Sequence, residues 1–222
     1  MDASGIAVEA LLDGYEAFGD PDFLNAAYRG CEWAMRYPFV PNTNYNSFSV
    51  FGLARTATAL AAALPEHRPK ASFAWAGWRG RKRPGDDPAH DFIGRACHLT
   101  ENGVFPNQQP NGGWPGHNSW VWYHGIILLG HARLLRALSR LPAGLPFQER
   151  IGPSLRESAI AAVNYLLRNL TPELDLYQNH ESTVPGMPGW PLLALCALSP
   201  EDVGGGEAVA RLRRLLSAAV VR

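Results

Sequence analysis

Residues 11–35 read LLDGYEAFGDPDFLNAAYRGCEWAM, and this stretch decides the fold. Apolar residues recur at three- and four-residue steps on both sides of its Gly-Asp-Pro turn, which is the period of an amphipathic helix. Gly19 can end one helix, Asp20 can cap the next, and Pro21 suits the first helical position. The stretch therefore predicts two helices, at about residues 5–18 and 21–36, which run antiparallel because the turn is short.

The rest of the chain repeats this helical pattern, and no segment alternates convincingly enough to be a β-strand. Further helices are expected at about residues 47–64, 88–100, 119–141, 153–170, 190–198 and 206–221. Ser47 would cap the first of these and Pro153 would open the fourth. Residues 65–90 are rich in proline, glycine and arginine and predict a long irregular excursion. We expect one all-α domain over residues 1–222, built from antiparallel helix pairs.

Composition excludes several classes of function. Lys plus Arg and Asp plus Glu each total 20, so the formal net charge is zero and nucleic acid is not an expected partner. The longest apolar runs, residues 125–130 and 191–198, fall short of the roughly 20 residues that cross a bilayer. The start of the chain is acidic and lacks a secretory signal pattern. We expect a cytoplasmic protein with no membrane partner, or a secreted or periplasmic one if the chain is a fragment of a longer protein.

Metal and cofactor signals are weak. The three cysteines, Cys31, Cys97 and Cys196, are odd in number and show no CxxC spacing, so buried free thiols are expected. Histidines at positions 117 and 124 are by themselves a weak signal for a metal. No P-loop, dinucleotide fingerprint or Gly-x-Ser-x-Gly elbow is present. We predict no metal and no cofactor.

Two segments resemble known helical families. Residues 11–35 resemble the helix-turn-helix unit of α/α toroid carbohydrate enzymes, the six-hairpin enzymes and polysaccharide lyases. Residues 105–135 resemble the Gln-x-x-x-Gly-x-Trp loop of terpenoid-cyclase and prenyltransferase toroids, with Gln108, Gly112 and Trp114 in the matching places. The same loop is similar to the NGGWP loop of one helical pectate lyase family. Far fewer helices are expected than the roughly twelve of a complete toroid, so the resemblance implies an incomplete α/α toroid or a helical barrel.

The departures from these families bear on activity. The chain lacks the DxDD acid motif of the terpenoid cyclases and a clear zinc-ligand set of the prenyltransferases. Outside the one loop it also lacks a matching set of the calcium and catalytic residues of the pectate lyase. The matches are shared by superfamilies with different chemistry, so they favour a fold more than an activity.

The densest group of candidate binding residues lies at the end of this loop and the start of the next helix. Its members are Trp114, His117, Trp120, Trp122, Tyr123 and His124. Aromatic faces stack on the apolar faces of sugar rings, and imidazole or phenol groups hydrogen-bond hydroxyls. On a helix, Tyr123 and His124 point about 100° apart, so one of them would face the cleft. We predict a glycan-binding cleft here; the structural alternative is that Trp114 packs the glycine loop.

A second polar segment, residues 177–183, would supply catalytic groups. If it meets the first group, His180 or Glu181 would act as general base, and Tyr123 as general acid. This arrangement resembles that of toroid polysaccharide lyases, in which an asparagine neutralises a uronate carboxylate, as Asn179 would here. Simple turn chemistry is the alternative for these residues.

Two further segments would add substrate contacts. Asn44 and Tyr45 precede an expected helix and would hydrogen-bond sugar hydroxyls, although turn and cap roles are equally expected. Trp78 and Arg79 would form a lid whose guanidinium meets an acidic sugar, with a solvated basic loop as the alternative.

The leading functional hypothesis is a polysaccharide lyase or glycoside hydrolase acting on a glycan in an aromatic-lined cleft. Its catalytic residues would be Tyr123, His124, His180 and Glu181. The loop carboxylates carry no glycosidase signature, so hydrolysis has no specific support. One alternative is a non-catalytic glycan-binding or scaffold module. The other is a terpenoid-cyclase-like enzyme, which predicts a closed apolar cavity with an acidic residue at its top.

Overall fold

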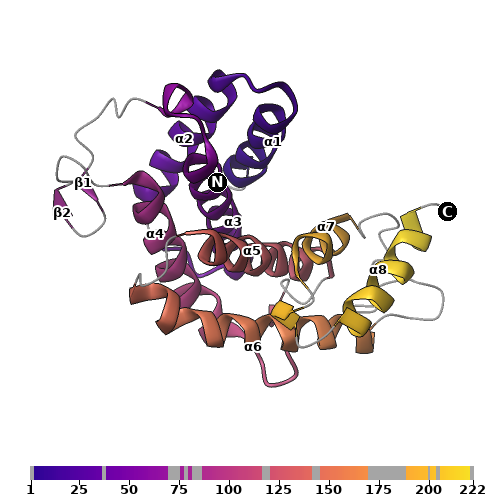
Figure 1. The fold of residues 1–222 in the computed structure, drawn as a ribbon. Helices are drawn as coiled ribbons and strands as arrows, with labels where there is room; N and C mark the ends of the chain where they lie inside the picture. The colour runs from indigo at the N-terminus through magenta and orange to yellow at the C-terminus, as the bar shows by residue number, and fades with distance from the viewer. Residues whose placement is uncertain are drawn as a thin grey trace.

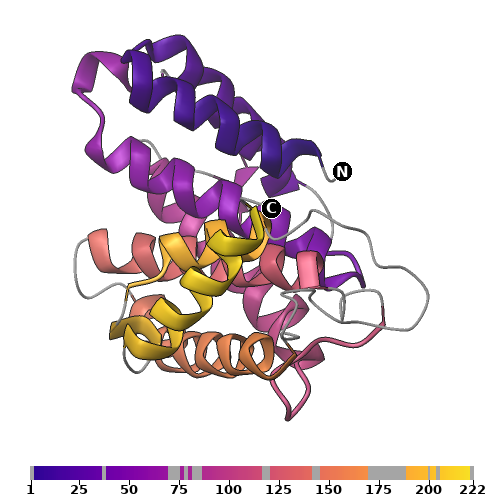
Figure 2. The same cartoon turned by 90° about the vertical axis from the view of Figure 1, so that its right-hand side faces the viewer.

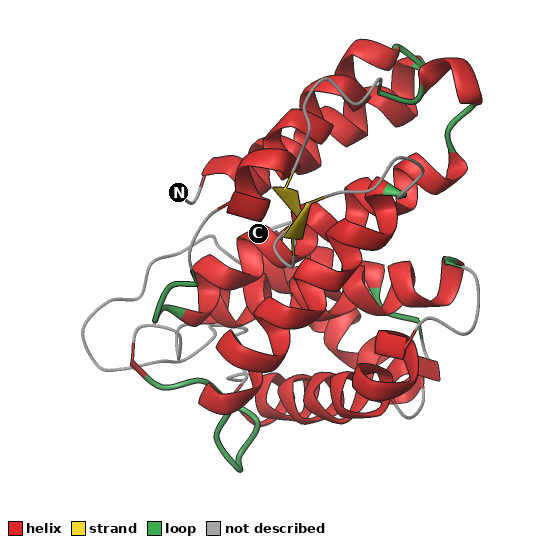
Figure 3. Ribbon diagram, turned by 90° about the vertical axis from the view of Figure 1, so that its left-hand side faces the viewer, coloured by secondary structure: helices red, strands yellow, loops and turns green. Residues whose placement is uncertain are grey.

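The computed structural model describes residues 3–36, 39–69, 76–77, 80–81, 87–116, 121–141, 146–169, 189–199, 201–203 and 206–220. This part of the chain is all-α, as predicted, apart from one antiparallel pairing of two-residue strands, β1 (Ala76–Gly77) and β2 (Gly80–Arg81) (Figure 3). Its eight α-helices (Figure 1) are α1 (Ala3–Phe18), α2 (Pro21–Arg36), α3 (Thr43–Ala62), α4 (Pro88–Gly103), α5 (Val121–Arg140), α6 (Pro146–Asn169), α7 (Gly189–Ala197) and α8 (Gly206–Val220). Half of the predicted excursion at residues 65–90, namely residues 70–75, 78–79 and 82–86, lies outside the described residues.

Two predicted helix starts are wrong. Helix α3 begins at Thr43 because Asn42 caps it, with its side-chain oxygen accepting the backbone N–H of Asn44 at 3.2 Å. Helix α6 begins at Pro146, so Pro153 lies inside the helix. A proline there loses one backbone hydrogen bond. The fully buried side chains on either side of it, Ile151 and Leu155, offset this loss by packing against the core.

The helices form two layers (Figures 1 and 2). The odd-numbered helices pack in chain order, α1 on α3, α3 on α5 and α5 on α7. The even-numbered helices pack against this row, and each also contacts the next even-numbered helix. Successive helix pairs therefore repeat one arrangement along the chain.

Residue contacts give the directions of the first helices. In α1 and α2, Gly14 faces Phe23 and Val8 faces Gly30, so this pair is antiparallel, as the short turn predicts. In α1 and α3, Gly5 faces Phe48 and Val8 faces Gly52, so these helices are parallel.

Helix α5 runs parallel to α3. Near the start of α3, Ser47 and Val50 face Gly130, while farther along α3 the charge of Arg55 acts on Arg136. Helices α1, α3 and α5 therefore all begin at the same end of the molecule.

Close contact between α1 and α3 depends on a glycine. A methyl group at Gly5 would lie about 2.3 Å from the carbonyl oxygen of Phe48, which is fixed backbone. We expect Gly5→Ala to lower the free energy of unfolding by about 1–3 kcal/mol, measured by urea denaturation. Gly130→Ala is the matched control, since its nearest neighbour is at an ordinary 3.5 Å and alanine favours a helix interior. Equal effects of the two changes would contradict the tight packing at Gly5.

No helix in the described ranges is long and apolar enough to cross a membrane.

Candidate functional site

Aromatic side chains occur where three of the odd-numbered helices, α3, α5 and α7, begin. Tyr45 lies in the first turn of α3, and Trp190 lies at the start of α7. The Trp190 ring stacks on Phe51, with ring centres 6.3 Å apart, and meets Phe48 edge to face at 6.2 Å. Helix α5 packs against both α3 and α7, yet these aromatic rings also join α3 directly to α7. The row of odd-numbered helices is therefore curved at this end.

Helix α5 adds two aromatic side chains at the same end. Trp122 and Tyr123 lie in its first turn, and their rings meet nearly at right angles with centres 5.5 Å apart. Both are half-buried, as is Trp190, while Tyr45 is 36% exposed. These four side chains thus keep part of their aromatic surface open. Trp190 was not among the predicted site residues, although an aromatic residue after the polar segment 177–183 was a signal for it.

His124 lies in the core. Its ring stacks on Tyr165 at 4.7 Å and lies 4.8 Å from the ring of Trp114. Its Nε2 lies 3.2 Å from the carbonyl oxygen of Ala162, which can only accept, so Nε2 carries the proton. Burial lowers the pKa of His124 to about 3, so the ring is neutral near pH 7. In this arrangement the imidazole does not reach a dissolved glycan.

Trp114 is also buried. Its indole N–H donates to the carbonyl oxygen of Val104 at 3.1 Å, and its side chain is 1% exposed. Nearby, Gln108 donates from Nε2 to the carbonyl oxygens of Gly112, at 3.1 Å, and Ser158, at 3.0 Å. The Gln-x-x-x-Gly-x-Trp segment thus binds the chain after α4 to α6, which is the packing role named above as its structural alternative.

The asparagines near α3 shape the chain turn. Asn44 is fully buried, whereas its neighbour Tyr45 faces outward. Asn46, also buried, bonds with both the N–H and the carbonyl oxygen of Val40, at 3.3 and 2.8 Å. Of the predicted pair Asn44 and Tyr45, only Tyr45 offers surface to a ligand here.

Seven predicted site residues lie outside the described residues, and their roles stay predictions. They are Trp78, Arg79, His117, Trp120, Asn179, His180 and Glu181.

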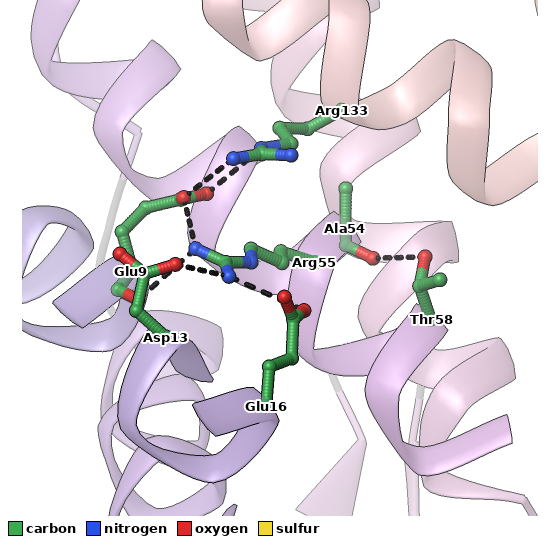
Figure 4. Close-up of polar contacts among 7 residues, drawn as sticks. All are labelled: Glu9, Asp13, Glu16, Ala54, Arg55, Thr58 and Arg133. Atoms are coloured by element: carbon green, nitrogen blue, oxygen red, sulfur yellow. Dashed lines mark hydrogen bonds and ion pairs between the residues drawn. The ribbon is translucent and has the colours of Figure 1, made fainter. Parts of the chain in front are cut away.

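A network of charges, with Glu9 and Arg55 buried at its centre, joins α1, α3 and α5 (Figure 4). Arg133 donates two hydrogen bonds to the Glu9 carboxylate, at 3.1 and 2.8 Å, and Arg55 binds the same carboxylate at 2.5 Å. Arg55 also binds Asp13 at 2.5 Å and Glu16 at 3.2 Å. Burial opposes the charge of Arg55, but the three carboxylates outweigh it and raise the pKa of the guanidinium.

This network was missed at the sequence level. Its one local signal is Glu9, a carboxylate beside Val8 on the face of α1 that carries Leu12. Because the charges of this network are paired with each other, we assign the network a role in stabilising the fold.

The cysteines of the described residues are not part of a metal-binding group. Within these ranges, no group of three or more His, Cys, Asp or Glu side chains could hold a metal ion. Cys31 and Cys97 are buried, and burial raises the pKa of both thiols to about 12. Cys196 is free but exposed, so the expectation of a buried thiol is wrong at this position.

Comparisons with protein-family models, curated proteins and solved structures gave no match.

Proposed function

We propose that this chain is a carbohydrate-active protein, a polysaccharide lyase or glycoside hydrolase, that binds its glycan where the odd-numbered helices begin. One observation carries the proposal. Tyr45, Trp122 and Tyr123 keep aromatic surface partly open in the first turns of α3 and α5, two parallel helices that begin at the same end. Partly exposed aromatic rings at the starts of two neighbouring helices suit the apolar faces of sugar rings.

The fold proposed with this function is an incomplete α/α toroid. Such a toroid needs an inner row of parallel helices, each followed by an antiparallel helix of an outer row. The packing of α1, α3, α5 and α7 in chain order supports this arrangement, as does the antiparallel pairing of α1 with α2. The curvature at the Trp190 contact with Phe48 and Phe51 supports an arc.

Among the described residues, Tyr123 is the candidate for proton transfer. Its phenol group would act as general acid, with His180 or Glu181 as base. The burial of His124 favours a supporting role for this residue, in which its ring holds Tyr165 and Trp114 in place. The same burial is the observation that favours the second candidate function, a glycan-binding module without catalysis.

The terpenoid-cyclase-like alternative has less support. It needs a closed apolar cavity, whereas Phe48, Phe51 and Trp190 contact one another between the starts of α3 and α7.

A panel of acidic and neutral polysaccharides tests the binding site. Binding would be followed by tryptophan fluorescence and by isothermal titration calorimetry. We expect Trp122→Ala to weaken binding about tenfold, because one stacking contact is lost. Phe18→Ala is the matched control, since this aromatic side chain is 76% exposed at the opposite end of α1 and should leave affinity unchanged.

Turnover separates the two candidate functions. It would be read from the ultraviolet absorbance of unsaturated uronates and from new reducing ends. We expect Tyr123→Phe to slow turnover by about 100-fold or more while binding is kept. Binding without turnover in the wild-type protein would favour the non-catalytic module. Absence of both for every polysaccharide would overturn the carbohydrate proposal.

A further inference from the structure

A chain of hydrogen bonds links the segment after α4 to both α5 and α6. The Oε1 atom of Gln108 lies 2.6 Å from the Ser158 hydroxyl oxygen, which lies 2.8 Å from Nε2 of His131. On the other side of the ring, Nδ1 of His131 lies 2.9 Å from the carbonyl oxygen of Ile127. His131 is 2% exposed and Ser158 is 6% exposed, so bulk water does not compete for these contacts.

The orientation of the Gln108 amide follows from its neighbours. Its nitrogen faces two carbonyl oxygens, those of Gly112 and Ser158, and carbonyl oxygens can only accept. Its oxygen therefore faces the Ser158 hydroxyl and needs a proton from it. The hydroxyl has one proton, while His131 stands on its other side.

When His131 is neutral, one of the contacts in this row of hydrogen bonds has no proton and cannot form a hydrogen bond. If Nδ1 holds the proton, Ser158 must donate to Nε2, and the oxygen of Gln108 receives none. If Nε2 holds it, Ser158 donates to Gln108, but the lone pair of Nδ1 then faces the Ile127 carbonyl oxygen. The imidazolium, which donates from both nitrogens, supplies a proton to every contact.

We propose that His131 and Ser158 form a proton-dependent latch on the segment that follows α4. Protonation of His131 turns the Ser158 hydroxyl toward Gln108 and fastens the segment to α6. Deprotonation lets the hydroxyl turn back toward the imidazole, and the segment loses one of its bonds. The latch acts close to Trp114, whose ring centre lies 5.8 Å from that of His131.

The surroundings of His131 shift its protonation to acid pH. Ser158 faces it from α6, the rings of Phe105 and Trp114 face it from the segment after α4, and His124 precedes it on α5. Among the described residues of α3, α4 and α7, no charged side chain acts on its pKa. Burial lowers the pKa of His131 to about 4.

Nuclear magnetic resonance of the intact protein tests the latch between pH 7 and pH 3.5. Two-bond ¹H–¹⁵N spectra would report the tautomer and protonation of His131. Hydrogen exchange would report the Gly112 amide, which donates to the Gln109 carbonyl oxygen at 2.8 Å. Corrected for the intrinsic rate, Gly112 exchange is expected to slow about tenfold as His131 becomes protonated, because one hydrogen bond is gained.

Variants separate the latch from general effects of acid. Ser158→Ala should hold neutral His131 in the Nδ1–H form and remove the slowing at Gly112. Ser154→Ala is the matched control, since this serine is exposed on the same helix and should keep the slowing. If Ser158→Ala does not fold, Gln108→Met tests the same step, because it leaves the hydroxyl no competing acceptor and should also remove the slowing.

Two results would overturn the latch. One is Gly112 exchange in the wild-type protein that does not change as His131 is protonated. The other is the same slowing in Ser158→Ala, or in Gln108→Met, as in the wild-type protein.

Discussion

Glu9→Gln is expected to lower the free energy of unfolding by about 3 kcal/mol, because it leaves buried positive charge uncompensated. Arg133 is 13% exposed, and both hydrogen bonds described for its guanidinium go to Glu9. Arg55 loses one of its carboxylates but keeps Asp13 and Glu16. The expected loss therefore lies at the low end of the range for breaking a buried ion pair. Urea denaturation at pH 7 would measure it.

Glu16→Gln is the matched control for this change. Glu16 binds the same arginine, Arg55, at 3.2 Å, but its side chain is 66% exposed. Water screens such a pair, so the expected loss is below about 1 kcal/mol. Equal losses in Glu9→Gln and Glu16→Gln would show that the buried carboxylate does not hold α1 to α3 and α5.

Acid is expected to unfold the protein through two histidines that lie buried in the described part of the chain, His124 and His131. Burial lowers the pKa of His124 to about 3 and that of His131 to about 4, from an ordinary value of 6.5. Below pH 6.5 these histidines therefore bind protons in the unfolded chain but stay neutral in the folded protein. The free energy of unfolding falls as pH falls. Well below pH 6.5 each histidine costs about 1.4 kcal/mol per pH unit, and the two together cost about 3 kcal/mol between pH 6.5 and pH 5.

Urea denaturation at a series of pH values measures this slope. His124→Phe and His131→Phe should each remove about half of the histidine contribution to it. Leu166→Ala is the control, because this fully buried side chain on α6 does not titrate and its loss should lower stability equally at every pH. An unchanged slope in both histidine variants would contradict the prediction. Protonation of His131 can still fasten the latch, because local bonding at Gln108 and global stability are separate quantities.

Local signals account for the parts of the fold that the sequence predicted. The Gly19, Asp20 and Pro21 turn predicts where α1 ends and α2 begins, since the cap and the proline act on their own backbone. The same kind of signal was ambiguous elsewhere. Both Asn42 and Ser47 can cap a helix, and the apolar period continues through Pro153, so choosing between possible starts needed the packed structure.

The candidate site, too, was predicted in part from the sequence and decided in part by the packed structure. The helical period predicted that Tyr123 and His124 point in different directions, but it carried no information on which of them faces the core. Packing of α5 on α6 decided this, because it places His124 against Ala162 and Tyr165. Trp190 could not be joined to Phe48 and Phe51 from the sequence, since about 140 residues separate them.

By itself, the sequence determined that this protein is built of paired helices and that aromatic residues occur near several helix starts. Both properties follow from side chains acting within one or two turns of their own helix. Only the tertiary structure decided that α1, α3 and α5 begin at one end, that Trp114 and His124 are buried, and that Glu9 lies between two arginines. These properties depend on contacts such as that between Glu9 and Arg133, 124 positions apart, and no local preference encodes them.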